Sequence, residues 1–172
     1  KTALMPKIRK HFGGSLKGKH FAMWGLAFKP DTDDMREASS RRMLDHLWDA
    51  GAKVRAFDPE AIGEAKRIYG ERADLVLCDS STATLDGADA LVVITEWKQF
   101  RSPDFGALKN ALTDAVLFDG RNLYRPADVE AAGVERARHG RAAQLHRSAA
   151  RCVQLAEGGQ RLLVAAQAVE RA

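Results

Sequence analysis

The stretch His20-Phe-Ala-Met-Trp-Gly-Leu-Ala27 decides the fold that this sequence predicts. It is a largely apolar run, preceded by Lys17-Gly-Lys19 and followed by Lys29-Pro30. Such a run between polar stops is typical of a β-strand that is buried on both faces. A strand is buried in this way when helices cover both sides of its sheet, so the run indicates an α/β fold.

The alternation of strand and helix continues on either side of this run. Upstream, an amphipathic helix is expected before Gly13-Gly14, because apolar residues recur at helical spacing over residues 4–12. Downstream, we expect strands at residues 53–57, 75–79, 90–95 and 115–119, and helices at residues 39–50, 61–69, 84–88 and 105–112. Five strands joined by helical crossovers predict a three-layer α/β fold with an open, mostly parallel, Rossmann-like sheet.

The loop after the first strand is the first candidate site, because ligands of such sheets bind beyond the carboxyl ends of the strands. Gly25 permits a close backbone approach, while Lys29 and Arg36 together suit a diphosphate. The start of the next helix would add amide donors. The spacing fits equally well a loop in which Asp33 or Asp34 caps the helix and both cations are solvated.

Two other strand ends carry polar residues. In Asp119-Gly-Arg-Asn122, the glycine permits a tight turn that projects Arg121 toward the ligand edge, where it would contact a phosphate or base. An ordinary Asp-Gly turn with an exposed arginine fits the same residues. After the 90–95 strand, Trp97 is expected to pack in the core and Glu96 to pair with a nearby base.

Several kinds of chemistry are not predicted. Neither the G-x-G-x-x-G turn nor G-x-x-x-x-G-K-[ST] follows any strand, so this chain is not expected to hold the primary NAD site. The carboxylates near Asp31 lack the spacing of a calcium loop, and no metal site is expected. Cys78 is interpreted as a small buried hydrophobe, and no catalytic residue is predicted in this chain.

The composition predicts one globular core and a cytoplasmic protein. The whole net charge of +4 comes from residues 134–172, which contain seven Arg, three Glu and neither Lys nor Asp. No basic stripe interleaved with aromatic residues accompanies them, so a nucleic-acid partner is not expected. No apolar stretch of membrane-spanning length and no secretion leader occurs. The two cysteines form no C-x-x-C motif, which favours a reducing compartment.

Four ordered motifs give a resemblance to a known family. They are Trp24-Gly-Leu-Ala-Phe-Lys-Pro-Asp-Thr-Asp-Asp-Met-Arg-Glu-Ala-Ser39, Phe57-Asp-Pro59, Thr95-Glu-Trp97 and Phe118-Asp-Gly-Arg-Asn122. Together they resemble the C-terminal UDP-binding domain of the UDP-glucose 6-dehydrogenases, over roughly residues 1–133. Such enzymes use NAD to oxidise the C6 hydroxyl of a UDP-sugar twice, through a catalytic cysteine. Their NAD fold and cysteine lie in regions that this chain lacks.

The resemblance also implies roles for residues. It assigns Phe28, Lys29 and Arg121 to the UDP-sugar and Arg36 to NAD, which the missing N-terminal domain would mainly bind. It implies a homodimer or larger homo-oligomer in the complete enzyme and no activity for this chain alone. It further implies that residues 1–14 are the end of a central linking helix, with an exposed apolar face that favours self-association.

The resemblance fails after Gly133. The family pattern continues roughly as G-x-x-Y-x-x-I-G-R, whereas this chain has Gly133-Val-Glu-Arg-Ala-Arg-His-Gly-Arg141. Residues 15–133 are therefore assigned to the UDP-sugar-binding domain and residues 134–172 to an atypical tail. Ten Ala and seven Arg among the tail's 39 residues fit a helix-prone extension, a disordered appendage or a shifted reading frame in GC-rich DNA.

Two alternatives to the UDP-glucose hypothesis remain open. One is the same domain of a GDP-mannose or UDP-N-acetylhexosamine dehydrogenase, because the choice of hexose depends on residues outside this chain. The other is a nucleotide-binding module with no reaction of its own.

Overall fold

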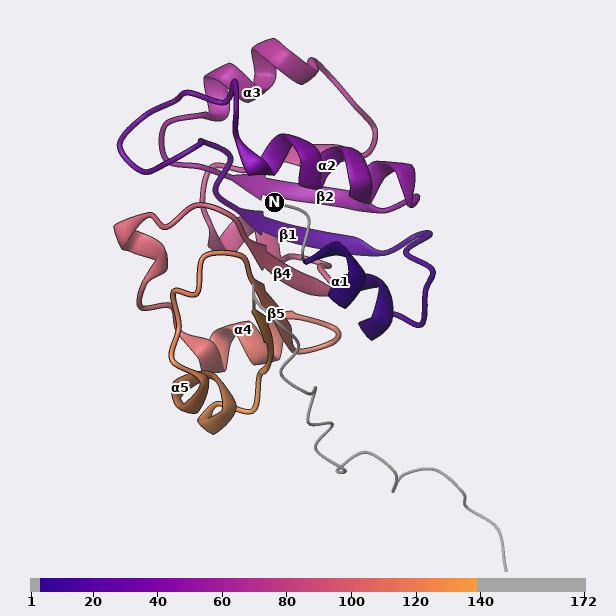
Figure 1. Cartoon of the computed structure of the whole chain (residues 1–172), viewed down its shortest axis with the longest axis vertical. Coiled ribbons are helices and arrows are strands. Elements are labelled where there is room, and N and C mark those ends of the chain that lie inside the picture. Colours follow the sequence, from indigo (N-terminus) through magenta and orange to yellow (C-terminus); the bar gives the residue numbers. More distant parts are fainter. Residues whose placement is uncertain (1–3, 139–172) are drawn as a thin grey trace, which may run out of the picture.

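The computed structural model describes residues 4–138, which form a parallel sheet between two layers of helices (Figure 1). The strands are β1 (His20–Trp24), β2 (Lys53–Phe57), β3 (Leu75–Leu77), β4 (Ala90–Val93), β5 (Val116–Asp119) and β6 (Glu135–Arg138). They lie in the order β3-β2-β1-β4-β5-β6, and every neighbouring pair is parallel. The predicted α/β fold of Rossmann-like type is confirmed.

Short helices connect the strands. The α-helices are α1 (Met5–His11), α2 (Ser39–Asp49), α3 (Ile62–Tyr69), α4 (Phe105–Ala111) and α5 (Pro126–Ala131). Two 3₁₀ helices, η1 (Thr82–Leu85) and η2 (Lys98–Phe100), complete the crossovers. None of the helices within residues 4–138 is long and apolar enough to cross a membrane.

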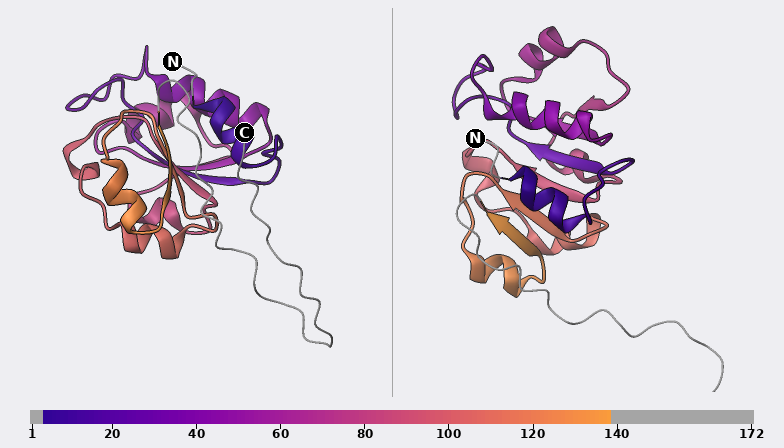
Figure 2. Two further views of the ribbon diagram at one scale, coloured as in Figure 1. Left: turned by 60° about the horizontal axis from the view of Figure 1, so that its bottom comes forward. Right: turned by 45° about the vertical axis from the view of Figure 1, so that its right-hand side comes forward.

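Alternate residues of the central strands are buried in two separate hydrophobic cores, one on each face of the sheet. Phe21 and Met23 of β1 point to the layer of α1, α2 and α3, whereas Ala22 and Trp24 point to the layer of η1, α4 and α5. The two helical layers are seen on opposite sides of the sheet in Figure 2. Burial on both faces is what the apolar run over β1 predicts.

The apolar face of α1 is not exposed, and the expectation of an exposed face there is wrong. Leu4, Met5 and Ile8 are all buried in the core that α2 shares. His11 packs edge-on against Phe118 of β5, with 5.8 Å between the ring centroids. Because this face already packs against the sheet, it gives no reason for the chain to self-associate.

A sixth strand was not predicted. β6 lies in the stretch assigned to the tail, and it pairs with β5 over four residues. Arg136 of β6 stands where the family pattern has tyrosine, and its Nη2 donates to the buried carboxylate of Asp119 at 2.8 Å. The sheet therefore continues beyond Gly133, and the rest of the predicted tail lies outside the described residues.

Candidate functional site

A hollow of about 760 Å³ opens at the carboxyl ends of β1, β4 and β5. It is lined by Leu4, Phe28, Lys29, Ser39, Met43, Ile94, Glu96, Arg101, Gly120, Arg121, Asn122 and Leu123. The chain runs from β1 outward to β2 and β3 on one side, and from β4 outward to β5 and β6 on the other. The hollow thus lies at the point where the strand order reverses, which is where doubly wound sheets bind their ligands.

The lining of the hollow is rich in positive charge. Lys29, Arg101 and Arg121 all contribute to it, against the single carboxylate of Glu96. The first residue of α2, Ser39, also lies on the wall, and the first turn of a helix carries amide groups with no partner inside the helix. This combination suits an anionic ligand with several oxygen acceptors, such as a phosphate or diphosphate.

Glu96 and Arg121 form a two-pronged ion pair on the wall of the hollow. The Nε and Nη2 atoms of Arg121 each donate to one carboxylate oxygen of Glu96. The hydrogen bonds from Arg121 are the main reason that the pKa of Glu96 lies below its usual value. The prediction that Glu96 pairs with a nearby base is confirmed.

The turn that carries Arg121 is held by a buried carboxylate. One oxygen of Asp119 accepts from the backbone amide of Arg121 at 3.0 Å. The other oxygen accepts from the amide of Tyr124 at 3.2 Å and from Arg136. A carboxylate with no solvent exposure is stable here because amides and a guanidinium surround it.

Asp58 is a second buried carboxylate, and it ties three loops together at the same edge. One oxygen accepts from the amides of Leu26 and Ala27, at 2.7 and 3.0 Å, and from the indole nitrogen of Trp97 at 3.1 Å. The other accepts from the amides of residues 60 and 61, at 3.0 and 2.9 Å. Asp58 thereby fixes the backbone that leads directly to Phe28 and Lys29.

The close approach at Gly25 is to the protein itself. Gly25 has a φ of +94°, and a Cβ atom placed on it would lie 2.5 Å from the Cβ of Thr95. The hydroxyl of Thr95 donates to the carbonyl of Ala27 at 2.7 Å. The glycine therefore lets the β1 and β4 loops pack together, and the predicted close backbone approach at Gly25 is made to Thr95. This loop does not fit the role of a dinucleotide cradle.

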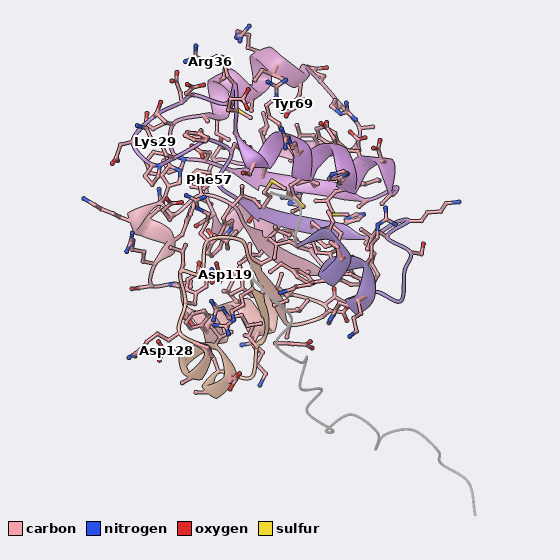
Figure 3. All side chains as sticks on the ribbon, in the orientation of Figure 1. Lys29, Arg36, Phe57, Tyr69, Asp119 and Asp128 are labelled. Carbon is pink, nitrogen blue, oxygen red and sulfur yellow. The ribbon has the colours of Figure 1, made fainter. Side chains whose placement is uncertain are left out.

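Arg36 lies away from the hollow. It is exposed, and both its backbone amide and its guanidinium donate to Asp34, at 2.8–3.1 Å. Figure 3 shows Lys29 and Arg36 on the same long loop, with Arg36 nearer to α3. α2 begins after Ala38 and has no side-chain cap, so neither Asp33 nor Asp34 caps it.

The structure thus brings three of the four predicted site residues, Phe28, Lys29 and Arg121, to one hollow and leaves Arg36 outside it. Arg101 was missed, because it is one arginine in a polar loop and gave no signal. Asp58 was recognised as a residue directly after a strand, but its role in tying the loops together was not predicted. Cys78 is buried, which raises the pKa of its thiol and agrees with an unreactive side chain.

A doubly wound parallel sheet with a cationic hollow at its reversal point defines a Rossmann-like domain of the kind that binds nucleotides. The chain belongs to the UDP-glucose/GDP-mannose dehydrogenase family: residues 22–126 match the family's UDP binding domain.

Curated relatives agree with this assignment. The chain is 48% identical over 130 residues to a UDP-glucose 6-dehydrogenase of Pseudomonas aeruginosa, a match that covers 74% of this chain and 29% of the relative. It is 40% identical over 141 residues to a UDP-glucose 6-dehydrogenase of Rhizobium meliloti, covering 82% of this chain and 32% of that protein. The chain therefore spans about a third of the length of these relatives.

Solved structures share the same domain. The chain aligns with an NDP-N-acetyl-D-galactosaminuronic acid dehydrogenase of Methanosarcina mazei with a TM-score of 0.64 at 26% identity, covering 78% of this chain and 27% of that one. It aligns with a UDP-glucose dehydrogenase of Pyrobaculum islandicum with a TM-score of 0.52 at 31% identity, covering 58% and 22%.

Proposed function

We propose that this chain binds the nucleotide of UDP-glucose as the UDP-sugar-binding domain of an NAD-dependent UDP-glucose 6-dehydrogenase. The observation that carries the proposal is the convergence of Lys29, Arg101 and Arg121 with the N-terminus of α2 on one hollow at the reversal point of the sheet. The high identity to UDP-glucose 6-dehydrogenases supports glucose as the sugar.

The residues of the hollow have distinct roles in this proposal. Lys29 and Arg121 neutralise the diphosphate, Lys29 as a mobile point charge near the sugar and Arg121 as a planar fork. Arg101 adds a third positive charge at the rim. Phe28 is 47% exposed, and its ring offers an apolar surface to the UDP-sugar beside the charged groups. A bound UDP-sugar would cover part of this ring and remove apolar surface from water.

The complete enzyme would convert UDP-glucose to UDP-glucuronate and would use two molecules of NAD as hydride acceptors. The residues of this chain do not fit the primary NAD site, because the loop after β1 is packed against Thr95. Within the proposal the chain contributes only Arg36 to the cofactor, from a loop that projects away from the hollow. α1 is proposed to be the end of the linking helix, in a cytoplasmic homo-oligomer.

Two alternatives give different results in the same experiments. A GDP-mannose or UDP-N-acetylhexosamine dehydrogenase would hold its nucleotide sugar in the same hollow. A non-catalytic nucleotide-binding module would bind the ligand without any reaction in the complete protein. An upstream glycine-rich NAD fold and a catalytic cysteine in the parent gene would exclude the second alternative.

The test of binding is a calorimetric titration of the 172-residue chain with UDP and with UDP-glucose. Lys29→Ala and Arg101→Ala are each expected to weaken binding about 5- to 30-fold, since each removes a charged contact to the diphosphate. Lys53→Ala is the matched control, because Lys53 is exposed at the opposite end of the sheet. Equal affinities for all four proteins would contradict the proposed site.

The test of the reaction uses the complete protein. Formation of NADH is followed with UDP-glucose, UDP-N-acetylglucosamine and GDP-mannose as separate substrates. The proposal expects turnover of UDP-glucose above the others. A preference for GDP-mannose or the N-acetyl sugar would transfer the assignment to a sister enzyme, and binding without NADH formation would favour the non-catalytic module.

A further inference from the structure

The pairing of Arg121 with Glu96 leaves one edge of the arginine unused. Both side chains are partly buried on the wall of the hollow, 36% and 28% exposed. Glu96 occupies the side edge of the guanidinium, formed by Nε and Nη2. A guanidinium has a second two-pronged edge, formed by Nη1 and Nη2, that fits a phosphate equally well. No acceptor within residues 4–138 bonds to Nη1 of Arg121.

Both ends of Arg121 are held in place. Asp119 fixes its backbone amide at 3.0 Å, and Glu96 fixes its guanidinium. Asp119 itself lies at the end of β5, inside the fold (Figure 3). An arginine held at both ends loses little conformational entropy when a ligand binds to its free edge.

We propose that Glu96 is a positioning residue for the diphosphate of the nucleotide, which orients the free edge of Arg121 toward the hollow. The inference rests on the proposed function, because it takes a nucleoside diphosphate as the ligand. Glu96 does not touch the ligand in this arrangement and acts through Arg121.

A competing role for Glu96 is that its charge repels the phosphates and occupies the arginine that should bind them. The geometry disfavours this role, because Glu96 uses the Nε–Nη2 edge and leaves the Nη1–Nη2 edge available to a phosphate. The charge of the hollow points the same way, since Lys29 and Arg101 line it as well and leave it positive after Glu96 is counted. The hydrogen bonds from Arg121 also keep the pKa of Glu96 low, so the pair stays ionised at neutral pH.

The experiment is a double-mutant cycle on the full 172-residue chain, with UDP as the titrant in a calorimeter. Glu96→Ala is expected to weaken UDP binding about 3- to 10-fold, because the guanidinium is no longer held. Glu96→Gln keeps one acceptor oxygen and should fall between Glu96→Ala and the parent. In an Arg121→Ala background, Glu96→Ala should cause no further weakening.

The chain offers a matched control. Glu64 and Arg67 on α3 form the same two-pronged pair, with distances of 2.7 and 2.8 Å, and neither residue lines the hollow. Glu64→Ala should leave UDP affinity within the error of the parent. Thermal melting of each variant shows whether the fold is retained, and the isosteric Glu96→Gln provides the comparison if Glu96→Ala does not fold.

The outcomes separate the inference from the function on which it rests. Failure of the parent chain to bind UDP would overturn both. If the parent binds UDP, tighter binding by Glu96→Ala would overturn the inference and show that Glu96 competes with the ligand. Equal weakening by Glu96→Ala with and without Arg121 would also overturn it, because the effect would not pass through the arginine.

Discussion

The carboxylate of Asp58 accepts a hydrogen bond from the indole nitrogen of Trp97 at 3.1 Å, and both side chains are buried. Asp58 lies at the end of β2 and Trp97 beyond the end of β4, so this bond joins loops on the two sides of β1. The same carboxylate accepts four backbone amides, and no cation bonds to it within residues 4–138. Both side-chain oxygens of residue 58 must therefore act as hydrogen-bond acceptors.

Asp58→Asn should therefore be strongly destabilising, although the two side chains have nearly the same shape. The asparagine NH₂ group would face at least two N–H donors, which would lose their acceptor. We expect the free energy of unfolding to fall by about 2–5 kcal/mol, measured by urea denaturation. Asp79→Asn is the control, because Asp79 is exposed, and it should change stability little. Similar losses in both variants would contradict this account of Asp58.

Gly25→Ala should damage the site and the fold together. A new Cβ would lie 2.5 Å from the Cβ and 2.6 Å from the backbone nitrogen of Thr95, and the φ of +94° is itself unfavourable for alanine. We expect a loss of more than about 3 kcal/mol in the free energy of unfolding.

Gly13→Ala separates the effect of the contact from the effect of the backbone. Gly13 also has a positive φ, +70°, but a Cβ there would meet no atom within 4 Å. The free energy of unfolding of Gly13→Ala should fall by about 1–2 kcal/mol, which is the cost of the left-handed conformation alone. If the two variants lost equal stability, the contact with Thr95 would not be the cause.

The layered fold could be predicted because its signals are local. The apolar run of β1 and the strands at residues 53–57 and 90–93 are buried on sheet faces, and their periodicity is visible in the sequence. The runs were predicted to extend slightly too far, since an apolar residue such as Leu26 continues the pattern after the hydrogen-bonded strand has ended at Trp24. Apolar residues in a sequence indicate which positions are buried, whereas the bounds of a strand also depend on hydrogen bonds to adjacent strands.

β6 was missed for the opposite reason. Glu-Arg-Ala-Arg over residues 135–138 has no apolar periodicity, and the strand depends on its four-residue pairing with β5 rather than on its own composition. In the same way, the partners of Asp58 lie up to 39 residues away in the chain. Contacts of this kind are set by the tertiary fold, so a single sequence does not reveal them. The position of Lys29 and Arg121 at the hollow could be predicted because each lies two residues after the end of a predicted strand.

The pair formed by Asp119 and Arg136 predicts that β6 stabilises the domain. Arg136→Leu would leave the carboxylate of Asp119 buried with two amide donors and no cation. The Nε and Nη1 atoms of Arg136 are buried without a partner within residues 4–138, so removing them offsets part of this cost. We expect a net loss of about 2–3 kcal/mol in the free energy of unfolding.

Arg138→Leu is the control for this prediction, because Arg138 lies on the same strand and its side chain is exposed. Its effect on chemical denaturation should stay within about 0.5 kcal/mol. Equal stability of the Arg136 variant and the parent would show that the buried pair is not needed to hold β6 on the sheet.

Tyr124 predicts how stability changes at alkaline pH. Its hydroxyl donates to the carbonyl of Phe100 at 2.7 Å, and burial, with a further contribution from the charge of Asp119, raises its pKa above the usual value. The folded chain therefore keeps this proton at a pH where the unfolded chain, with a pKa near 10, releases it. The stabilising contribution is fully present below about pH 10 and is lost as the pH rises above it, by up to about 1.4 kcal/mol per pH unit.

Tyr124→Phe isolates this contribution from other groups that titrate at high pH. At neutral pH the variant should be less stable by about 1 kcal/mol, because it lacks the hydrogen bond to Phe100. Above about pH 10 the parent loses stability that the variant does not, so the difference should shrink and then reverse. Tyr69, whose pKa burial also raises, is present in both proteins and cancels from the difference. Urea denaturation from neutral pH to about pH 11 measures the difference in free energy of unfolding between the parent and the variant. A difference that stayed constant over this range would contradict the assignment to Tyr124.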